Sequence, residues 1–167
     1  MKLYLLRHGL AAELGTAGIT RDSERPLTPE GRLKLKRTTA AMQAMKLSFA
    51  VILSSPFVRA RQTAEIVAQA FQAEKRLQFA EELGCGGDVR ELIGRLAAGV
   101  PVPESVLLVG HEPDLSELVS VLCSGEPGLP LAFKKGGLCR LSVESLSYGR
   151  CATLEWLLTP KLMALMA

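Results

Sequence analysis

Three short runs of consecutive apolar residues constrain the fold of this chain more than any other feature. They cover residues 3–6, 49–53 and 106–109. Runs of this length, without alternating polar positions, are typical of central strands that are covered on both faces. Residues 138–143 and 152–158 alternate more, so we expect them to form later strands nearer the edge of the sheet. Because segments with helical spacing separate the apolar runs, the sequence predicts a layered α/β domain.

Two of the predicted helices have clear start signals. Thr28 as the N-cap and Pro29 as the first helical residue predict a helix that runs to about Lys46. We expect its apolar face to carry Leu33, Ala40, Ala41, Ala44 and Leu47. Ser55 and Pro56 give the same signals for a second helix. The apolar positions of that helix are Ala60, Ala64, Val67, Ala68 and Phe71.

Further helices are predicted over residues 88–96 and after Pro113, and loops over residues 9–26, 84–87 and 124–137. None of these loops has the repetitive composition of a linker, and there is no internal repeat. We therefore expect a single domain over the whole chain.

Composition and charge exclude several classes of protein. The chain has 167 residues, of which 48% are hydrophobic and 22% charged, which is typical of a globular domain and excludes intrinsic disorder. The net charge of +3 is too small to predict nucleic-acid binding, although it fits a local anion site. No apolar run approaches the roughly 20 residues that span a bilayer, so we expect no membrane segment. The sequence does not predict the oligomeric state.

The cysteines and the first residues predict the compartment. The segment Met1–His8 is too short in its apolar part for a secretory signal. The cysteines are widely spaced and form no metal-ligand or redox motif: Cys85, Cys123, Cys139 and Cys151. We interpret them as reduced thiols of a cytoplasmic protein.

Both histidines of the chain follow predicted buried strands. His8 comes after the run 3–6, and His111 comes after the run 106–109. Ligand sites of open α/β sheets form at the carboxyl ends of strands, so these histidines can meet if their strands are neighbours. A single histidine in such a place is more often a core or surface residue. Two together indicate a site.

Two arginines extend this site. Arg7 directly follows an apolar strand, where it must find an anion or reach solvent, and its guanidinium is suited to phosphate. Arg59 lies in the first turn of a helix whose N-terminus points to the same edge of the sheet, and a helix N-terminus also favours an anion. By contrast, Arg61 faces Glu65 one turn later, which predicts an exposed ion pair.

These residues stand within segments that resemble the histidine phosphatase superfamily, which has the phosphoglycerate mutase-like fold. The segments are Leu5–Gly9 (L-L-R-H-G), Ser54–Ala64 (S-S-P-x-x-R-A-x-Q-T-A), Val109–His111 (V-G-H) and Arg25–Gly31 (R-P-L-T-P-E-G). They occur in the family's order. With only 51 residues between Arg59 and His111, and with the stretch around Glu82–Asp88, the chain is most similar to the SixA-type phosphohistidine phosphatases.

The resemblance implies a three-layer α/β/α sandwich with a mostly parallel central sheet. It also implies that neutral His8 attacks phosphorus and forms a phosphohistidine intermediate, while Arg7, Arg59 and His111 bind the phosphoryl group and stabilise its negative charge. Neither a metal nor another cofactor is expected. The implied partner is a phosphorylated protein of the histidine phosphotransfer type, or else a small phosphate ester.

Three positions leave the details of this site open. Glu82 falls roughly where related mutases place their general acid, but it is equally well interpreted as a surface carboxylate beside Glu81. Arg25 is a further candidate for substrate binding. Leu10 departs from the family, which often has an acidic or amide residue after the glycine, and Glu13 could substitute for that residue or simply be solvated. A small-molecule phosphomonoesterase and a non-catalytic phosphate-binding module are the alternative functions.

Overall fold

A computed structural model describes residues 1–99 and 102–166 of the chain. It contains a six-stranded sheet with the order β3-β2-β4-β1-β5-β6. The strands are β1 (Lys2–Arg7), β2 (Val51–Ser54), β3 (Leu77–Phe79), β4 (Ser105–Gly110), β5 (Leu138–Val143) and β6 (Ala152–Leu158). Strands β1, β2, β3 and β4 are parallel to one another, whereas β5 and β6 are antiparallel to their neighbours. The mostly parallel sheet predicted from the family resemblance is confirmed.

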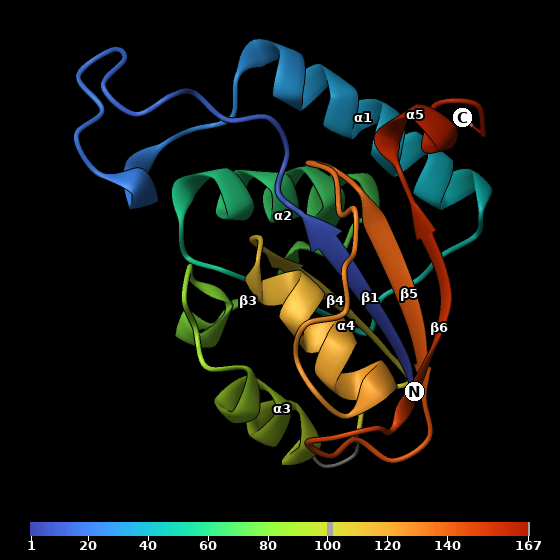
Figure 1. Cartoon of the computed structure of the whole chain (residues 1–167). Helices are drawn as coiled ribbons and strands as arrows, with labels where there is room; N and C mark the ends of the chain where they lie inside the picture. Colours follow the sequence, from blue (N-terminus) through green and yellow to red (C-terminus); the bar gives the residue numbers. More distant parts are fainter. Residues whose placement is uncertain (100–101, 167) are drawn as a thin grey trace.

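Helices cover both faces of this sheet (Figure 1). They are α1 (Pro29–Ala44), α2 (Val58–Ala70), α3 (Val89–Ala97), α4 (Asp114–Ser124) and the short α5 (Pro160–Met163). Alternate residues of β1 show the three layers directly. Leu3 and Leu5 are buried in one core with residues of α3 and α4, while Tyr4 and Leu6 are buried in a second core with residues of α1, α2 and α5. The expected α/β/α sandwich is therefore present.

The register of the parallel strands brings the candidate residues to one edge. Arg7 at the end of β1 lies opposite Gly110 at the end of β4, and Ser54 of β2 lies opposite Val109. The loops that follow these three strands consequently start side by side. No helix within the described residues is long and apolar enough to cross a membrane.

The apolar face predicted for α1 was mostly wrong in phase, although Ala41 is buried as predicted. Leu33 has 54% of its surface exposed, whereas Leu35 and Met42 are fully buried. The buried stripe also includes Gly31, Thr38 and Thr39, so hydrophobic spacing could not identify it. The N-cap at Thr28 is confirmed, because its hydroxyl accepts a hydrogen bond from the amide of Gly31 at 3.0 Å.

The start of α2 and one strand also differ from the prediction. Helix α2 begins at Val58 rather than Pro56. The hydroxyl of Ser55 accepts a hydrogen bond from the backbone amide of Phe57 at 3.2 Å, before the helix begins. Strand β3 escaped prediction because it has only three residues, two of them exposed. Helix α3 lies where a helix over residues 88–96 was predicted, and the side chain of Asp88 caps it, which was not predicted.

Candidate active site

The two histidines meet because β1 and β4 are adjacent. His8 and His111 are the first residues after these strands, and their ring centroids are 5.1 Å apart. Both side chains are buried, with 6% and 1% of their surface exposed. The backbone amide of His8 donates to the carbonyl of Gly110 at 3.1 Å, which extends the strand pairing into the site. The predicted meeting of the histidines is present in the structure.

Two hydrogen bonds fix the ring of His8. Its Nδ1 lies 2.7 Å from the carbonyl oxygen of Gly9, which can only accept, so Nδ1 carries the proton and Nε2 holds the lone pair. Nε of Arg59 donates to this Nε2 at 3.2 Å. Burial lowers the pKa of His8 to about 3, so the imidazole is neutral at neutral pH. A neutral ring with a free lone pair is a nucleophile.

Arg59 occupies the centre of the cluster from the first turn of α2. Its side chain is buried, and Nη1 donates to the backbone carbonyl of Asp22 at 2.6 Å. Nη2 lies 2.8 Å from the carboxylate of Asp22 and 3.3 Å from the thiol of Cys85. Sequence reasoning missed both partners, because they come from loops whose course no periodicity reveals.

Ser55 orients His111. Its hydroxyl oxygen lies 2.8 Å from Nε2 of His111 and already accepts the amide of Phe57, so the hydroxyl proton is available to that ring nitrogen. When the hydroxyl donates to Nε2, Nδ1 of His111 carries the ring proton and is a donor. Burial lowers the pKa of His111 to about 4. The sequence indicated Ser55 only as a helix cap, yet its contact with His111 belongs to the site.

Two buried nitrogen atoms of the site have no hydrogen-bond partner among the described residues: Nε of Arg7 and Nδ1 of His111. Arg7 is held by a bond from Nη1 to the carbonyl of Phe133 at 2.7 Å. Partial burial, with a smaller contribution from Arg59, lowers the pKa of Arg7. Buried polar groups are rarely left unpaired, so these nitrogens indicate a place for an anionic ligand.

Residues of the S-S-P-x-x-R-A-x-Q-T-A segment tie the site together. The hydroxyl of Thr63 accepts the amide of Gly9 at 3.1 Å and donates to the carbonyl of Arg59 at 2.7 Å. The side chain of Gln62 accepts the amide of Leu27 at 2.9 Å. These contacts join the loop after β1 to α2, and they explain why this segment carries a threonine and a glutamine.

Arg25 is bound within the loop that follows β1. Its Nε donates to the carbonyl of Ala12 at 2.6 Å, and its Nη1 lies 2.8 Å from the carboxylate of Asp22. Asp22 thus bridges Arg25 and Arg59. Although partial burial opposes it, hydrogen bonding to both arginines lowers the pKa of Asp22, which is therefore ionised. In this structure Arg25 contacts Arg59 only through this carboxylate.

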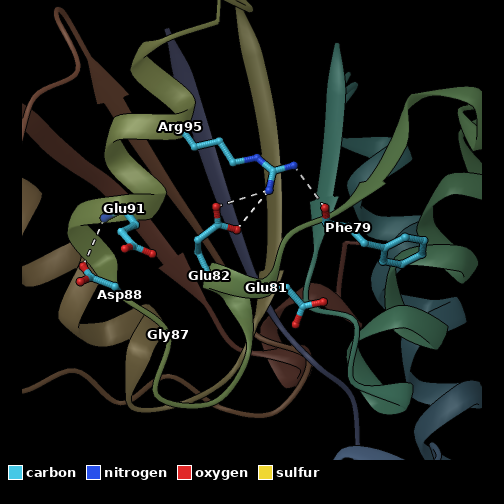
Figure 2. A pocket seen from close by; sticks show the side chains of 7 residues that line it. All are labelled: Phe79, Glu81, Glu82, Gly87, Asp88, Glu91 and Arg95. Atoms are coloured by element: carbon cyan, nitrogen blue, oxygen red, sulfur yellow. Dashed lines mark hydrogen bonds and ion pairs between the residues drawn. The ribbon is translucent and has the colours of Figure 1, made fainter.

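Glu82 points into a different pocket. It lies in a 3₁₀ turn (Glu81–Leu83), and its carboxylate pairs with Arg95 of α3 at 3.1 Å. Figure 2 shows this pairing in a pocket of about 440 Å³. The pocket is lined by Phe79, Glu81, Glu82, Gly87, Asp88, Glu91 and Arg95. No described contact joins Glu82 to His8, His111, Arg7 or Arg59.

The cluster combines the neutral imidazole of His8 with three cationic or hydrogen-bond donor side chains, which suits transfer of a phosphoryl group. Within residues 1–99 and 102–166, no three His, Cys, Asp or Glu side chains are grouped to hold a metal ion. Arg61 lies outside the cluster and pairs with Glu65 at 3.7 Å on the exposed face of α2.

Several known proteins are similar to this chain over most of its length. Residues 3–84 match the family described as histidine phosphatase superfamily, branch 1. An uncharacterised protein of Picosynechococcus sp. is 38% identical over 142 residues, which is 84% of each chain. The phosphohistidine phosphatase SixA of Escherichia coli is 32% identical over 164 residues, covering 96% of this chain and 94% of SixA.

Comparison with solved structures also shows a similarity to SixA. A structure of the protein histidine phosphatase SixA complexed with tungstate superposes with a TM-score of 0.83 at 28% identity, covering 96% of this chain and 98% of that chain. The segments that resemble the family in sequence are those that meet around His8 in space. The chain therefore belongs to the histidine phosphatase superfamily and is a phosphatase homologous to SixA.

Proposed function

We propose that this phosphatase removes the phosphoryl group from phosphohistidine on a partner protein, with His8 as the nucleophile. The observation that carries the proposal is the state of Asp22, the carboxylate that contacts Arg59. Asp22 is bound to Arg59 and Arg25, and Glu82 is bound to Arg95. Hydrogen bonds from the two arginines lower the pKa of Asp22, so this carboxylate is a poor general acid and the site suits a leaving group that needs little protonation.

In the first step, Nε2 of His8 attacks phosphorus and the phosphorus–nitrogen bond of the substrate breaks. The leaving imidazole takes a proton from water or arrives already protonated, since its pKa is near 6.5. Arg7, Arg59 and His111 stabilise the charge on the three phosphoryl oxygens. In the second step, water attacks the phosphorus on His8, which releases inorganic phosphate and restores the neutral ring.

The chain between Arg59 and His111 supports a protein substrate. Its 51 residues include most of α2, then β3, the Glu81–Leu83 turn, α3 and β4. Helix α3 is anchored in the core by Leu92 and Ile93. This segment therefore covers a face of the sheet and forms no extra subdomain over the histidines within its described part. Such a site is accessible to a phosphohistidine that projects from another protein.

A small phosphate ester is the second candidate substrate, and Asp114 is the observation that favours it. This residue begins α4, three positions after His111, and partial burial raises its pKa above the usual value. Its carboxylate accepts the amide of Gly86, next to Cys85, which contacts Arg59. An alkoxide leaving group requires an acid, and a carboxyl group with a raised pKa can supply the proton.

A substrate panel tests the proposal. The values of kcat/KM are compared for a phosphohistidine-bearing phosphotransfer protein, a phosphoserine peptide and sugar phosphates. The proposal predicts that the phosphohistidine protein exceeds the esters by at least about 10²-fold, the lower limit of what general acid catalysis contributes to ester cleavage. Equal or greater activity on an ester would assign the enzyme to small phosphomonoesters. A chain that binds phosphate without turnover of any substrate would be a binding module.

A further inference from the structure

A groove with a strongly basic lining lies between α1, α5 and the loop before β5. It encloses about 350 Å³ and is lined by Lys34, Arg37, Lys134, Lys135, Pro160, Lys161 and Ala164, which we call the basic groove. All five cationic side chains are exposed. Figure 1 shows α5 lying against α1 at the end of the sheet where β1 runs into its loop.

The charge of the basic groove is largely uncompensated. Its lining contains no carboxylate. Lys34 pairs with Glu30 at 2.6 Å, whereas Arg37, Lys134, Lys135 and Lys161 make no salt bridge with any other described residue. The whole chain has a net charge of only +3, so five cations in one groove are a local concentration of charge. Such a concentration attracts anionic partners and accelerates their association.

The basic groove extends toward the segment that directly follows His8. A smaller cavity of about 100 Å³ shares Lys34, Lys135 and Pro160 with it and extends to Gly9 and Leu10, directly after His8.

The same loop also contacts the backbone of the site. The amide of Gly136 donates to the carbonyls of Arg7 and His8, at 3.0 Å each, and Phe133 accepts from the side chain of Arg7. A segment that lies in the basic groove is therefore next to the loop that binds the backbone of Arg7 and His8.

We propose that the basic groove docks an acidic surface of the phosphorylated partner protein and so delivers its phosphohistidine to His8. The inference rests on the proposed function. It adds that the docking surface of the partner protein is acidic. Pro160, Ala164 and the aliphatic stems of the cationic residues give the groove an apolar floor, which a protein segment can cover. Free phosphohistidine is too small to occupy both the site and the groove. The groove therefore distinguishes protein-borne from free substrate.

Charge reversal tests this inference. The substrate is an acidic phosphotransfer domain that carries phosphohistidine. In the double variant Arg37→Glu/Lys161→Glu, kcat/KM for this substrate should fall at least about tenfold, because steering and docking are lost. Turnover of free phosphohistidine should stay within about twofold, because neither residue touches the site. Added salt should lower kcat/KM of the unmodified enzyme on the phosphoprotein more than that of the variant.

The matched control is Lys46→Glu/Lys75→Glu, which makes the same change in charge. These exposed lysines precede the amino ends of β2 and β3, and neither lines the basic groove, so phosphoprotein turnover should stay unchanged. An equal loss of kcat/KM on the phosphoprotein in the control and groove variants would overturn the docking inference. An equal loss of kcat/KM on the phosphoprotein and on free phosphohistidine in the groove variant would also overturn it. Loss of binding to phosphatidylglycerol vesicles, with phosphoprotein kinetics unchanged, would assign the groove to a membrane surface and also overturn it.

Failure of the docking inference is distinguishable from failure of the proposed function. An unmodified enzyme that hydrolyses neither form of phosphohistidine contradicts the proposed function, and the docking inference fails with it. An unmodified enzyme that hydrolyses both forms, together with a groove variant that behaves like the control, contradicts only the docking inference.

Discussion

Nε of Arg59 donates a hydrogen bond to Nε2 of His8 across 3.2 Å. This contact requires a lone pair on Nε2, which agrees with the proton on Nδ1 that is bound to the carbonyl of Gly9. The guanidinium therefore sits beside the nitrogen that we propose as the nucleophile. A phosphoryl group that approaches Nε2 meets the positive charge of Arg59 at the same point, so positioning and charge stabilisation come from one side chain.

The two arginines of α2 make the first prediction, because they differ by only two positions. Arg59→Ala should lower kcat about 10²–10³-fold, the usual cost of removing a donor that stabilises transition-state charge. Arg61→Ala should leave kcat unchanged and cost about 0.2–0.5 kcal/mol of stability, since it removes an exposed i,i+4 pair. Steady-state kinetics and urea unfolding measure both effects. The opposite order of catalytic loss would contradict this assignment.

The histidines predict how stability depends on pH. Their folded pKa values, about 3 for His8 and about 4 for His111, lie below the ordinary value of 6.5. Between pH 6.5 and 4 the unfolded chain consequently binds protons that the folded chain does not. The free energy of unfolding should thus fall with decreasing pH, by up to about 1.4 kcal/mol per unit for each histidine.

Urea unfolding at pH 7, 6 and 5 checks this dependence, with His111→Asn as the comparison. The variant should lose stability with about half the slope of the unmodified protein, because only His8 remains to titrate. Asp22 does not interfere, because its lowered pKa keeps it ionised over this range. Identical slopes in the two proteins would show that His111 is not held neutral by burial.

The strongest sequence predictions concerned elements with an uninterrupted physical pattern. β1 and β4 were predictable because strands buried on both faces are apolar at nearly every position. The N-cap at Thr28 was predictable because only a few residue types are preferred at the start of a helix. The face of α1 was not predictable, since Gly31 and two threonines fill buried positions that hydrophobic spacing leaves out.

The site residues that lie next to predicted strands were also predictable from the sequence. Arg7, His8, Arg59 and His111 follow or adjoin predicted strands, so topology alone brings them to one edge. Partners that arrive through loops were not predictable. Asp22 reaches Arg59 from a polar loop across 37 positions of sequence, and Ser55 reaches His111 across 56. Long-range side-chain contacts of this kind leave no local pattern.

Carboxyl groups give a prediction about substrate class. Glu82→Gln should change phosphohistidine and ester hydrolysis equally little, because its carboxylate is bound to Arg95. Asp114→Asn should slow ester hydrolysis about 10²-fold or more if Asp114 supplies a proton to an alkoxide, and should spare phosphohistidine. Parallel assays with both substrates separate the two residues. A large loss on ester alone in Glu82→Gln would restore Glu82 as the general acid.

Metal removal gives a further expectation. Activity should persist in excess chelator, because cationic and donor side chains around His8 already supply the charge that a metal would provide. The assay compares kcat/KM before and after dialysis against chelator. Loss of turnover that a divalent ion restores would mean that the phosphate is bound through a metal, contrary to the assignment of Arg7, Arg59 and His111.

Trapping the phosphoenzyme tests the central claim most directly. The enzyme is mixed with a phosphohistidine-bearing phosphotransfer protein, quenched in alkali within milliseconds, and the peptide that contains His8 is analysed by mass spectrometry. The proposed mechanism predicts an acid-labile phosphate on His8 that forms and decays at the rate of turnover, and neither phosphate nor turnover in His8→Ala. Normal turnover by His8→Ala, or phosphate release without any label on His8, would contradict it.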